Sequence, residues 1–283
     1  MSADVYAALL RAADGHCFEL QQVLPATPRA RLLWLPALGV AARHYLPLAH
    51  ALAARGIAVY LHEWRGHGSS SLRASRTVDW GYRALLDHDL PASHGELQAA
   101  DAAHGALPWI FGGHSLGGQL ACLHAARNGV PARLWLVASG SPWWRSFTGI
   151  RGSLLPLAYR FLPWLAQRHG LLPGRRLGFG GNEARGLISD WARVGLTNRY
   201  AARGLDQDLE RALRGLEGRA QAVVLQDDWM APRGSLMALL DKLPELRHTI
   251  DVLTPQQLGV AADHFAWMRA PDAVADTLCR ALR

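Results

Sequence analysis

The sequence predicts an α/β protein in which a mostly parallel central sheet is flanked by helices and carries an inserted helical cap. Three observations lead to this prediction. Short apolar runs alternate with helical stretches of about 10 to 20 residues in the first part of the chain. The alternation stops over residues 141–216 and then resumes. A glycine-rich turn also joins one of the buried strands directly to a helix.

The first elements follow from hydrophobic pattern and turn residues. Asp14 and Gly15 are a hairpin signal before a strand over residues 16–24, which indicates an antiparallel entry hairpin. Residues 31–35 form the next predicted strand, since residues 32–35 are apolar without alternation, as is typical of a strand buried on both faces of a parallel sheet. The same reasoning predicts helix 45–55, strand 56–61, helix 78–103, strand 108–111, helix 116–128 and strand 133–137. Parallel strands joined by helices imply right-handed crossovers.

The middle of the chain breaks this rhythm. Residues 141–216 are rich in Trp, Leu, Arg, Pro and Gly at helical spacing, and we interpret them as the inserted cap. The core domain is then predicted to comprise residues 1–140 and 217–283. Its second part contains strand 222–225, helix 236–243, strand 247–253 and a closing helix over 271–282.

The charge balance is strongly positive but does not indicate a nucleic-acid partner. The net charge is +7 and the pI is about 9.9. Lys242 is the only lysine, and the arginines are spread along the chain without a long basic run. Nucleic-acid recognition requires a clustered basic stripe or a reader motif. We therefore expect no nucleic-acid partner.

Cysteine usage and the length of the apolar runs bear on location. Cys17, Cys122 and Cys279 are far apart, unlike a disulfide framework or a metal site. Asp4 stands where a signal peptide carries positive charge. No apolar run approaches the roughly 20 residues of a membrane span. The sequence predicts a cytoplasmic protein without a transmembrane segment, although its apolar, arginine-rich middle leaves contact with a membrane surface open.

The glycine-rich turn carries the candidate nucleophile. Residues 111–118 read Phe-Gly-Gly-His-Ser-Leu-Gly-Gly and join a strand to a helix, the context of a G-x-S-x-G nucleophile elbow. Small residues two before and two after the serine prevent a clash between strand and helix, and Gly113 and Gly117 meet this need. Ser115 is therefore the predicted nucleophile. The alternative is a glycine-rich turn with an inert serine.

A serine hydroxyl requires a histidine base and a carboxylate that orients the histidine. In the elbow-containing fold both follow the serine, the acid first. Asp227 and Asp228 come close after strand 222–225. We prefer Asp228 because this fold commonly has a proline four residues after the acid, and Pro232 stands at that position. Asp227 remains open as the acid. His264 lies after the last strand and before the last helix, and it is the predicted base.

Acyl transfer also requires N–H donors for the developing oxyanion. The backbone N–H of Leu116, directly after the nucleophile, is the first expected donor. The second is expected from the loop after an early strand, where aligning the start of the following helix selects Leu38. Pro36-Ala37 stands in place of the common His-Gly pair, so Ala37 and Gly39 remain open as donors.

These motifs together resemble α/β-hydrolases of the serine aminopeptidase-like type. The resemblance rests on the elbow, on residues 63–70 (Glu-Trp-Arg-Gly-His-Gly-Ser-Ser) and on the segments around Asp228 and His264. The family pattern usually has Asp where Glu63 stands. Residues 174–180, with Asp-Trp-Ala-Arg at 190–193, further resemble a bacterial group of predicted α/β-hydrolases. The resemblance implies an α/β-hydrolase fold and a Ser-His-Asp triad over nearly the whole chain, and it names no substrate.

The aromatic cap suggests the substrate class. Trp143 and Trp144 are the predicted pocket residues, since apolar pockets with a few polar groups are usual for small molecules. We expect a carboxylesterase-like serine hydrolase that cleaves an ester or thioester of a small apolar acyl or aryl group, with no cofactor and no metal. An acyltransferase using the same triad and a non-catalytic ligand-binding protein are the alternatives. The oligomeric state is left open.

Overall fold

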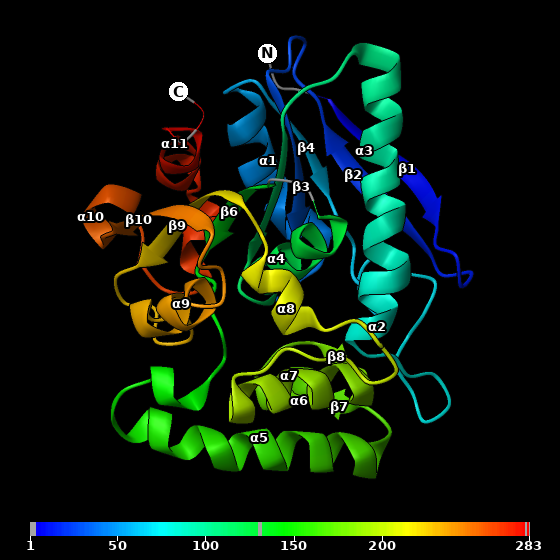
Figure 1. The fold of residues 1–283 in the computed structure, drawn as a ribbon, viewed down its shortest axis with the longest axis vertical. Coiled ribbons are helices and arrows are strands. Elements are labelled where there is room, and N and C mark those ends of the chain that lie inside the picture. The colour runs from blue at the N-terminus through cyan, green and yellow to red at the C-terminus, as the bar shows by residue number, and fades with distance from the viewer. Residues whose placement is uncertain (1–3, 130–131, 281, 283) are drawn as a thin grey trace.

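The computed structural model describes residues 4–129, 132–280 and 282. Its centre is an eight-stranded sheet in the order β1-β2-β4-β3-β5-β6-β9-β10 (Figure 1). The strands are β1 (Val5–Arg11), β2 (Cys17–Val23), β3 (Ala30–Leu35), β4 (Ile57–Leu61), β5 (Trp109–His114), β6 (Ala132–Val137), β9 (Gly218–Leu225) and β10 (Leu246–Leu253). The predicted fold class is confirmed.

Strand pairing separates an antiparallel entrance from a parallel centre. The pairs β1–β2 and β2–β4 are antiparallel, and every other pair of the sheet is parallel. The entry hairpin turns at Gly15, whose φ of 89° is a conformation that favours glycine. All residues of β3 and β4 are buried, which confirms that their continuous apolar runs lie under helices on both faces.

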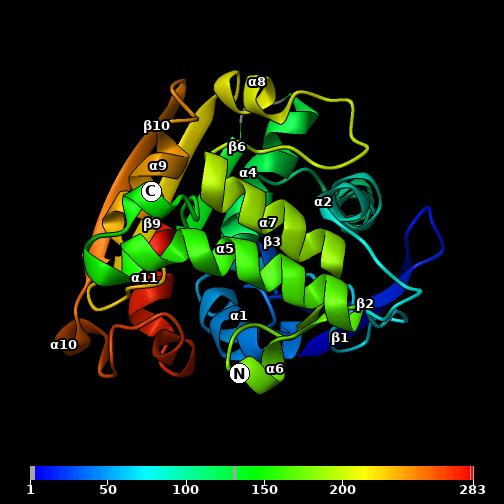
Figure 2. The ribbon, with the colours of Figure 1, turned by 90° about the horizontal axis from the view of Figure 1, so that it is seen from below.

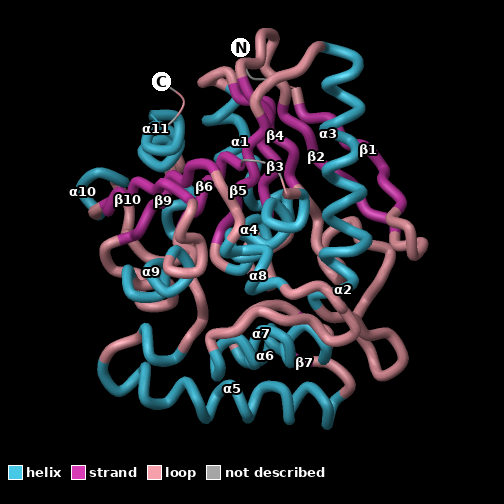
Figure 3. The backbone as a smooth tube through the Cα atoms, viewed as in Figure 1, coloured by secondary structure: helices cyan, strands magenta, loops and turns pink. Residues whose placement is uncertain are grey.

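Helices cover the two faces of the sheet and enclose a core on each side (Figure 3). One core contains side chains of α1 (Leu46–Ala53) and α11 (Asp272–Arg280). The other contains side chains of α3 (Leu90–His104), α4 (Leu116–Asn128), α8 (Leu209–Arg214) and α9 (Arg233–Leu240). Short helical segments connect them: Ala42–Tyr45, α10 (Pro255–Leu258) and Ala266–Arg269.

The helix predicted over residues 78–103 is divided. It begins with α2 (Tyr82–Ala84), passes through a π-helical segment (Leu85–Asp89) and continues as α3. Pro91 stands at the start of α3 and has no N–H, and its ring would clash with the carbonyl group of Asp87 in a regular helix. The wider π turn accommodates that carbonyl group without ending the helix.

The chain between β6 and β9 contains the segment predicted as the cap. Its elements are Trp144–Ser146, α5 (Gly149–His169), β7 (Leu172–Pro173), α6 (Gly174–Leu177), β8 (Asn182–Glu183), α7 (Arg185–Thr197) and α8. Helices α5, α6 and α7 lie together beyond one end of the central sheet (Figures 1 and 2). Leu209 and Leu213 of α8 instead join the core cluster of α4. No helix in the described part of the chain is long and apolar enough to cross a membrane.

Two histidines in the core give the fold a pH dependence. His62, whose Nδ1 lies 2.8 Å from Ser93 Oγ, and His124 are buried, and burial lowers the pKa of each to about 3. The unfolded chain therefore binds more protons than the folded chain between about pH 3 and 6.5. Stability is fully present above pH 6.5 and falls on acidification, by up to ~1.4 kcal/mol per pH unit for each histidine.

We expect His62→Asn, which keeps a hydrogen-bonding side chain, to reduce the fall in Tm between pH 7 and pH 5 relative to the parent protein. The physical reason is the loss of one group that must remain neutral in the folded state. Thermal unfolding followed by circular dichroism at the two pH values measures the effect. Exposed His248→Asn is the control and should leave the fall unchanged. An equal fall in the parent and the His62 variant would contradict the assignment.

Candidate active site

Ser115 stands at the sharp turn between β5 and α4. Its φ of 54° and ψ of −119° are a strained conformation for a residue with a side chain. The neighbouring glycines make the turn possible. A Cβ at Gly113 would overlap the backbone of Gly117, and a Cβ at Gly117 would overlap the carbonyl oxygen of Leu35. These residues therefore form the geometry of a nucleophile elbow.

Hydrogen bonds from the neighbouring strand hold this turn. The N–H of Ser115 donates to Val137 O at 3.1 Å, and the hydroxyl of Ser139 donates to Ser115 O at 2.7 Å. Gly118 lies so close to Ser139 that a Cβ there would overlap its hydroxyl oxygen. Ser139 is a positioning contact that the sequence pattern does not reveal, because it lies two residues after β6 and not in the elbow.

Asp228 and His264 form a buried pair at the carboxyl end of the sheet. His264 Nδ1 lies 2.7 Å from Asp228 Oδ2, and both side chains are at most 5% exposed. The second carboxylate oxygen, Oδ1, accepts from the N–H groups of Met230 (2.8 Å) and Ala231 (3.1 Å). Because both oxygens are bound, the carboxylate has a fixed orientation toward the imidazole ring.

Asp227, the rival acid, lies outside this pair. Its side chain is exposed and accepts a 3.4 Å hydrogen bond from Gln226. Asp263, next to the histidine, is also exposed, and its Oδ1 accepts from the N–H groups of Phe265 and Ala266. Of these carboxylates, Asp228 is the one that the structure brings to His264.

The loop after β3 places the candidate oxyanion donors beside the elbow. Ala37 N–H donates to the hydroxyl oxygen of Tyr45 at 2.9 Å, and that hydroxyl group in turn lies 2.8 Å from His114 Nδ1. Ala37, Leu38 and Leu116 all line the cavity that contains Ser115, but the N–H of Ala37 is already occupied by Tyr45. Since Leu116 is the first residue of α4, its N–H has no intrahelical acceptor.

The Tyr45 contact also fixes the state of His114. A hydroxyl group that accepts from Ala37 has its own proton to donate, so His114 Nδ1 accepts it and the ring is neutral. Burial, followed by the nearby His264, holds the pKa of His114 well below its usual range. The His114 and His264 ring centroids are 4.6 Å apart. A neutral, hydrogen-bonded His114 therefore packs against His264 without competing for its proton.

Residues 63–70 hold the loop after β3 in place. Trp64 Nε1 donates to Pro36 O at 2.9 Å, and Glu63 Oε1 accepts from Ala42 N–H at 3.1 Å. Burial raises the pKa of Glu63, and the hydrogen bond from Ala42 N–H opposes this shift. His67 Nε2 lies 3.1 Å from Glu183 Oε1 of β8. This motif thus ties the loop after β3 to the segment between β6 and β9.

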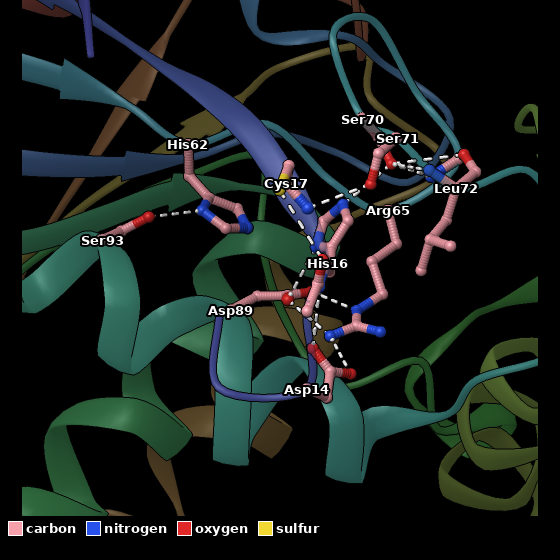
Figure 4. Close-up of polar contacts among 12 residues, drawn as sticks. Asp14, His16, Cys17, His62, Arg65, Ser70, Ser71, Leu72, Asp89 and Ser93 are labelled. Carbon is pink, nitrogen blue, oxygen red and sulfur yellow. Dashed lines mark hydrogen bonds and ion pairs between the residues drawn. The ribbon is translucent and has the colours of Figure 1, made fainter. Parts of the chain in front are cut away.

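A second Ser-His-Asp arrangement lies near the entry hairpin (Figure 4). His16 lies 2.9 Å from both Ser70 Oγ and Asp89 Oδ1. Here, however, Ser70 Oγ accepts from the N–H groups of Gly66 and Leu72, and Arg65 pairs with both oxygens of Asp89. All of these polar side chains are buried at 5% exposure or less. Such a fully bonded cluster ties the hairpin to the π-helical segment before α3 and leaves no accessible nucleophile.

A cavity of about 110 Å³ opens at Ser115 and His264. Its walls are largely apolar, and the polar side chains Gln119 and Ser235 also line it. Tyr200 donates to Gln119 Oε1 at 3.1 Å, which fixes the orientation of that amide. The segment between β6 and β9 contributes the following residues to the lining: Pro142, Phe147, Leu155, Tyr159, Phe179, Gly180 and Trp191.

The pocket prediction for Trp143 and Trp144 needs correction. Both are half-buried, and neither is among the described residues that line this cavity. Trp144 instead lies under the guanidinium group of Arg145, 5.1 Å from the ring centroid. Phe147, three residues further along, supplies the aromatic wall. Neighbouring aromatics in an irregular segment face different directions, which sequence spacing alone does not determine.

A family comparison agrees with this geometry. A model of the family described as serine aminopeptidase, S33, matches residues 26–191, more than half of the 283-residue chain. The chain belongs to this family. The stretch that matches the serine aminopeptidase model contains Ser115 and its glycines, and Asp228 and His264 lie beyond it. None of the curated proteins compared with this family member matches it.

Solved structures share the α/β-hydrolase fold of this serine aminopeptidase family member. The α/β hydrolase GrgF from Penicillium sp. sh18 is 16% identical with a TM-score of 0.58, covering 98% of both chains. A carboxylesterase of the thaumarchaeon Nitrososphaera gargenis is 16% identical with a TM-score of 0.60, covering 97% of both. The esterase EaEST from Exiguobacterium antarcticum is 14% identical with a TM-score of 0.61, covering 98% of this chain and 99% of that one.

Proposed function

We propose that the protein is a serine hydrolase that cleaves a carboxylic ester or thioester through an acyl-enzyme on Ser115. The observation that carries this proposal is the convergence of three groups. A strained elbow serine and a histidine line one cavity, and that histidine is held at 2.7 Å by a buried, doubly bonded carboxylate. This is the arrangement that activates a serine hydroxyl group.

In the proposed mechanism, His264 is the general base. Asp228 binds Nδ1, which leaves Nε2 to take the proton of Ser115 as the oxygen attacks the substrate carbonyl. The imidazolium ion that forms is stabilised by the Asp228 carboxylate and then protonates the leaving alcohol or thiol. Water, deprotonated by His264, cleaves the acyl-enzyme and releases the acid and free Ser115.

The oxyanion that develops during attack is assigned to the N–H groups of Leu116 and Leu38. Leu116 follows the nucleophile at the N-terminus of α4, where N–H groups point out of the helix and favour negative charge. The bond between Ala37 and Tyr45 removes Ala37 from the candidates and supports Leu38, with Gly39 as the remaining alternative. Donors of this kind typically contribute about 10²- to 10³-fold in kcat each.

The cavity supports a substrate with a small apolar acyl or aryl group. Apolar walls accept such a group, and Gln119 offers a polar contact one helical turn beyond Ser115. We further propose that residues 141–216 act as a cap over this cavity, since α5 and α7 supply part of its wall. Three free cysteines fit the reducing cytoplasm proposed as its location.

Probe labelling and a substrate panel test this function. The wild-type protein is incubated with a fluorophosphonate probe, and the labelled peptide is identified by mass spectrometry. We expect the adduct on Ser115, together with turnover of p-nitrophenyl esters. Labelling at another residue would contradict the assignment of Ser115 as the nucleophile. No labelling together with no turnover would favour the non-catalytic alternative. Faster acyl transfer to an added alcohol than to water would favour the acyltransferase.

Acyl selectivity should respond to Phe147 rather than to Trp143. Phe147→Ala removes an apolar wall and is expected to shift kcat/KM toward bulkier acyl groups by about 10- to 200-fold, the range for one altered apolar contact. Trp143→Ala, from the same loop but outside the cavity lining, is the matched control. It should lower Tm and leave the profile of kcat/KM against acyl length unchanged. The opposite pattern would return the pocket assignment to Trp143.

A further inference from the structure

The outward face of α5 is a continuous apolar stripe. Its members are large side chains with exposed fractions between 51% and 77%: Ile150, Leu154, Leu157, Phe161 and Trp164. They are spaced alternately four and three residues apart, so they share one side of the helix over about 21 Å. We refer to these five residues as the α5 stripe.

The opposite face of α5 is already used for packing. Gly152, Tyr159 and Ala166 are buried there, and Tyr159 reaches the cavity and contacts Trp191 of α7 with ring centroids 5.0 Å apart. A helix that only covers a core has a polar outer face, whereas α5 is apolar on its outer face as well as on its buried face. Figure 2 looks onto this side of the molecule, and no other element lies in front of α5. An exposed apolar patch of this extent indicates an interaction site.

The charged side chains of the segment that contains the α5 stripe are all positive. Residues 141–182 contain six arginines and no aspartate or glutamate. Arg151 and Arg160 lie on opposite sides of the stripe at 100° per residue, and both are exposed. Two carboxylates near the cap already pair with other arginines: Asp79 with Arg185 and Asp190 with Arg193. The partner of this face should therefore be apolar and anionic.

We propose that the α5 stripe docks on the surface of a membrane that contains anionic lipids. Helix α5 lies in the plane of the interface, its large side chains enter the boundary between headgroups and acyl chains, and the flanking arginines contact headgroup phosphates. A helix with Trp, Phe and Leu on one face and arginines beside it has the composition of interfacial helices. Each arginine near an anionic surface strengthens binding by roughly fivefold.

A second copy of the chain fits the same face poorly. Pairing two α5 stripes about a two-fold axis would bring the arginines of both copies together, and the segment supplies no acid to neutralise them. An anionic bilayer provides both properties at once, since the apolar side chains and the arginines find their partners at different depths of the same surface.

Docking would place the cavity rim at the interface. Trp229 lines the cavity and is 51% exposed, and the guanidinium group of Arg151 lies over its ring at 4.8 Å from the centroid. The rim therefore adjoins the N-terminal end of the stripe. A small apolar ester dissolved in the bilayer would meet the cavity directly. The docking proposal itself does not depend on the catalytic assignment.

Vesicle co-sedimentation tests the apolar part of the proposal. The full chain is mixed with anionic vesicles of phosphatidylcholine that contain about 30% phosphatidylglycerol. A second sample is mixed with vesicles of phosphatidylcholine alone. We expect binding to the anionic vesicles. Leu157→Gln with Phe161→Gln should weaken it at least roughly tenfold, since two large apolar side chains no longer enter the bilayer. Tyr6→Gln with Leu9→Gln, exposed on β1, is the matched control and should bind as the parent does.

Charge and fold are tested separately. Arg151→Gln with Arg160→Gln should also weaken binding at least roughly tenfold, and added salt should reduce the binding of the parent protein. Unchanged Tm shows that both variants fold. The Leu157/Phe161 variant should also keep its turnover of a water-soluble ester, because neither residue lines the cavity. Equal binding by the parent protein, the Leu157/Phe161 variant and the Arg151/Arg160 variant would overturn the proposal. A dimer in analytical ultracentrifugation that Leu157→Gln dissociates, without vesicle binding, would overturn it in favour of self-association.

Discussion

Ser115→Ala is expected to lower kcat/KM for p-nitrophenyl esters by about 10³-fold or more and to abolish fluorophosphonate labelling. The substitution removes the only atom that can form the proposed acyl-enzyme. It leaves the turn in place, because the bonds that hold it come from the backbone of Ser115 and from Ser139. Residual activity would reflect substrate binding and oxyanion donors acting without a nucleophile.

Ser70→Ala is the matched control, because Ser70 belongs to the other Ser-His-Asp arrangement of this chain. Its hydroxyl group bonds backbone groups in a buried loop, so its loss should lower Tm and leave labelling intact. Steady-state kinetics, labelling and thermal unfolding of both variants distinguish the two serines. Labelling that survives Ser115→Ala and disappears in Ser70→Ala would move the active site to the entry hairpin.

The strands of the core were predictable because their signals are local. Residues 32–35 and 56–61 are apolar without alternation, and the observed β3 and β4 are buried throughout. The division of the helix predicted over residues 78–103 was harder to predict. Pro91 is visible in the sequence, but a proline can end a helix, kink it or be accommodated by a π turn, and tertiary packing decides between these outcomes.

Within the candidate site, the parts that depend on tertiary contacts could not be predicted from the sequence. The bond from Ala37 to Tyr45, which bears on the choice of oxyanion donor, requires the placement of a helix against the loop after β3. Ser139 bonds the elbow from the segment directly after β6, and the sequence around Ser115 does not indicate this contact. Likewise, the choice between Trp143 and Phe147 as wall residues depends on how the loop before α5 folds.

Asp228→Asn is expected to lower kcat by about 10⁴-fold, by comparison with the best-studied triad. The amide oxygen can still accept from Met230 and Ala231 N–H, so the side chain keeps its position. Its NH₂ group then faces His264 Nδ1 and donates to it. The imidazole proton is thereby moved to Nε2, where the ring can no longer take the proton of Ser115.

Asp227→Asn changes the same charge one residue away and separates this effect from a general loss of negative charge. Asp227 is exposed and its side chain bonds Gln226, so its substitution should leave kcat nearly unchanged and alter the free energy of unfolding by no more than about 0.5 kcal/mol, as is usual for surface substitutions. Steady-state kinetics of the two variants on one ester give the ranking, and thermal unfolding confirms that both fold. Because the two side chains leave adjacent residues in different directions, only one of them reaches His264. A greater loss in Asp227→Asn than in Asp228→Asn would assign that role to Asp227 in solution.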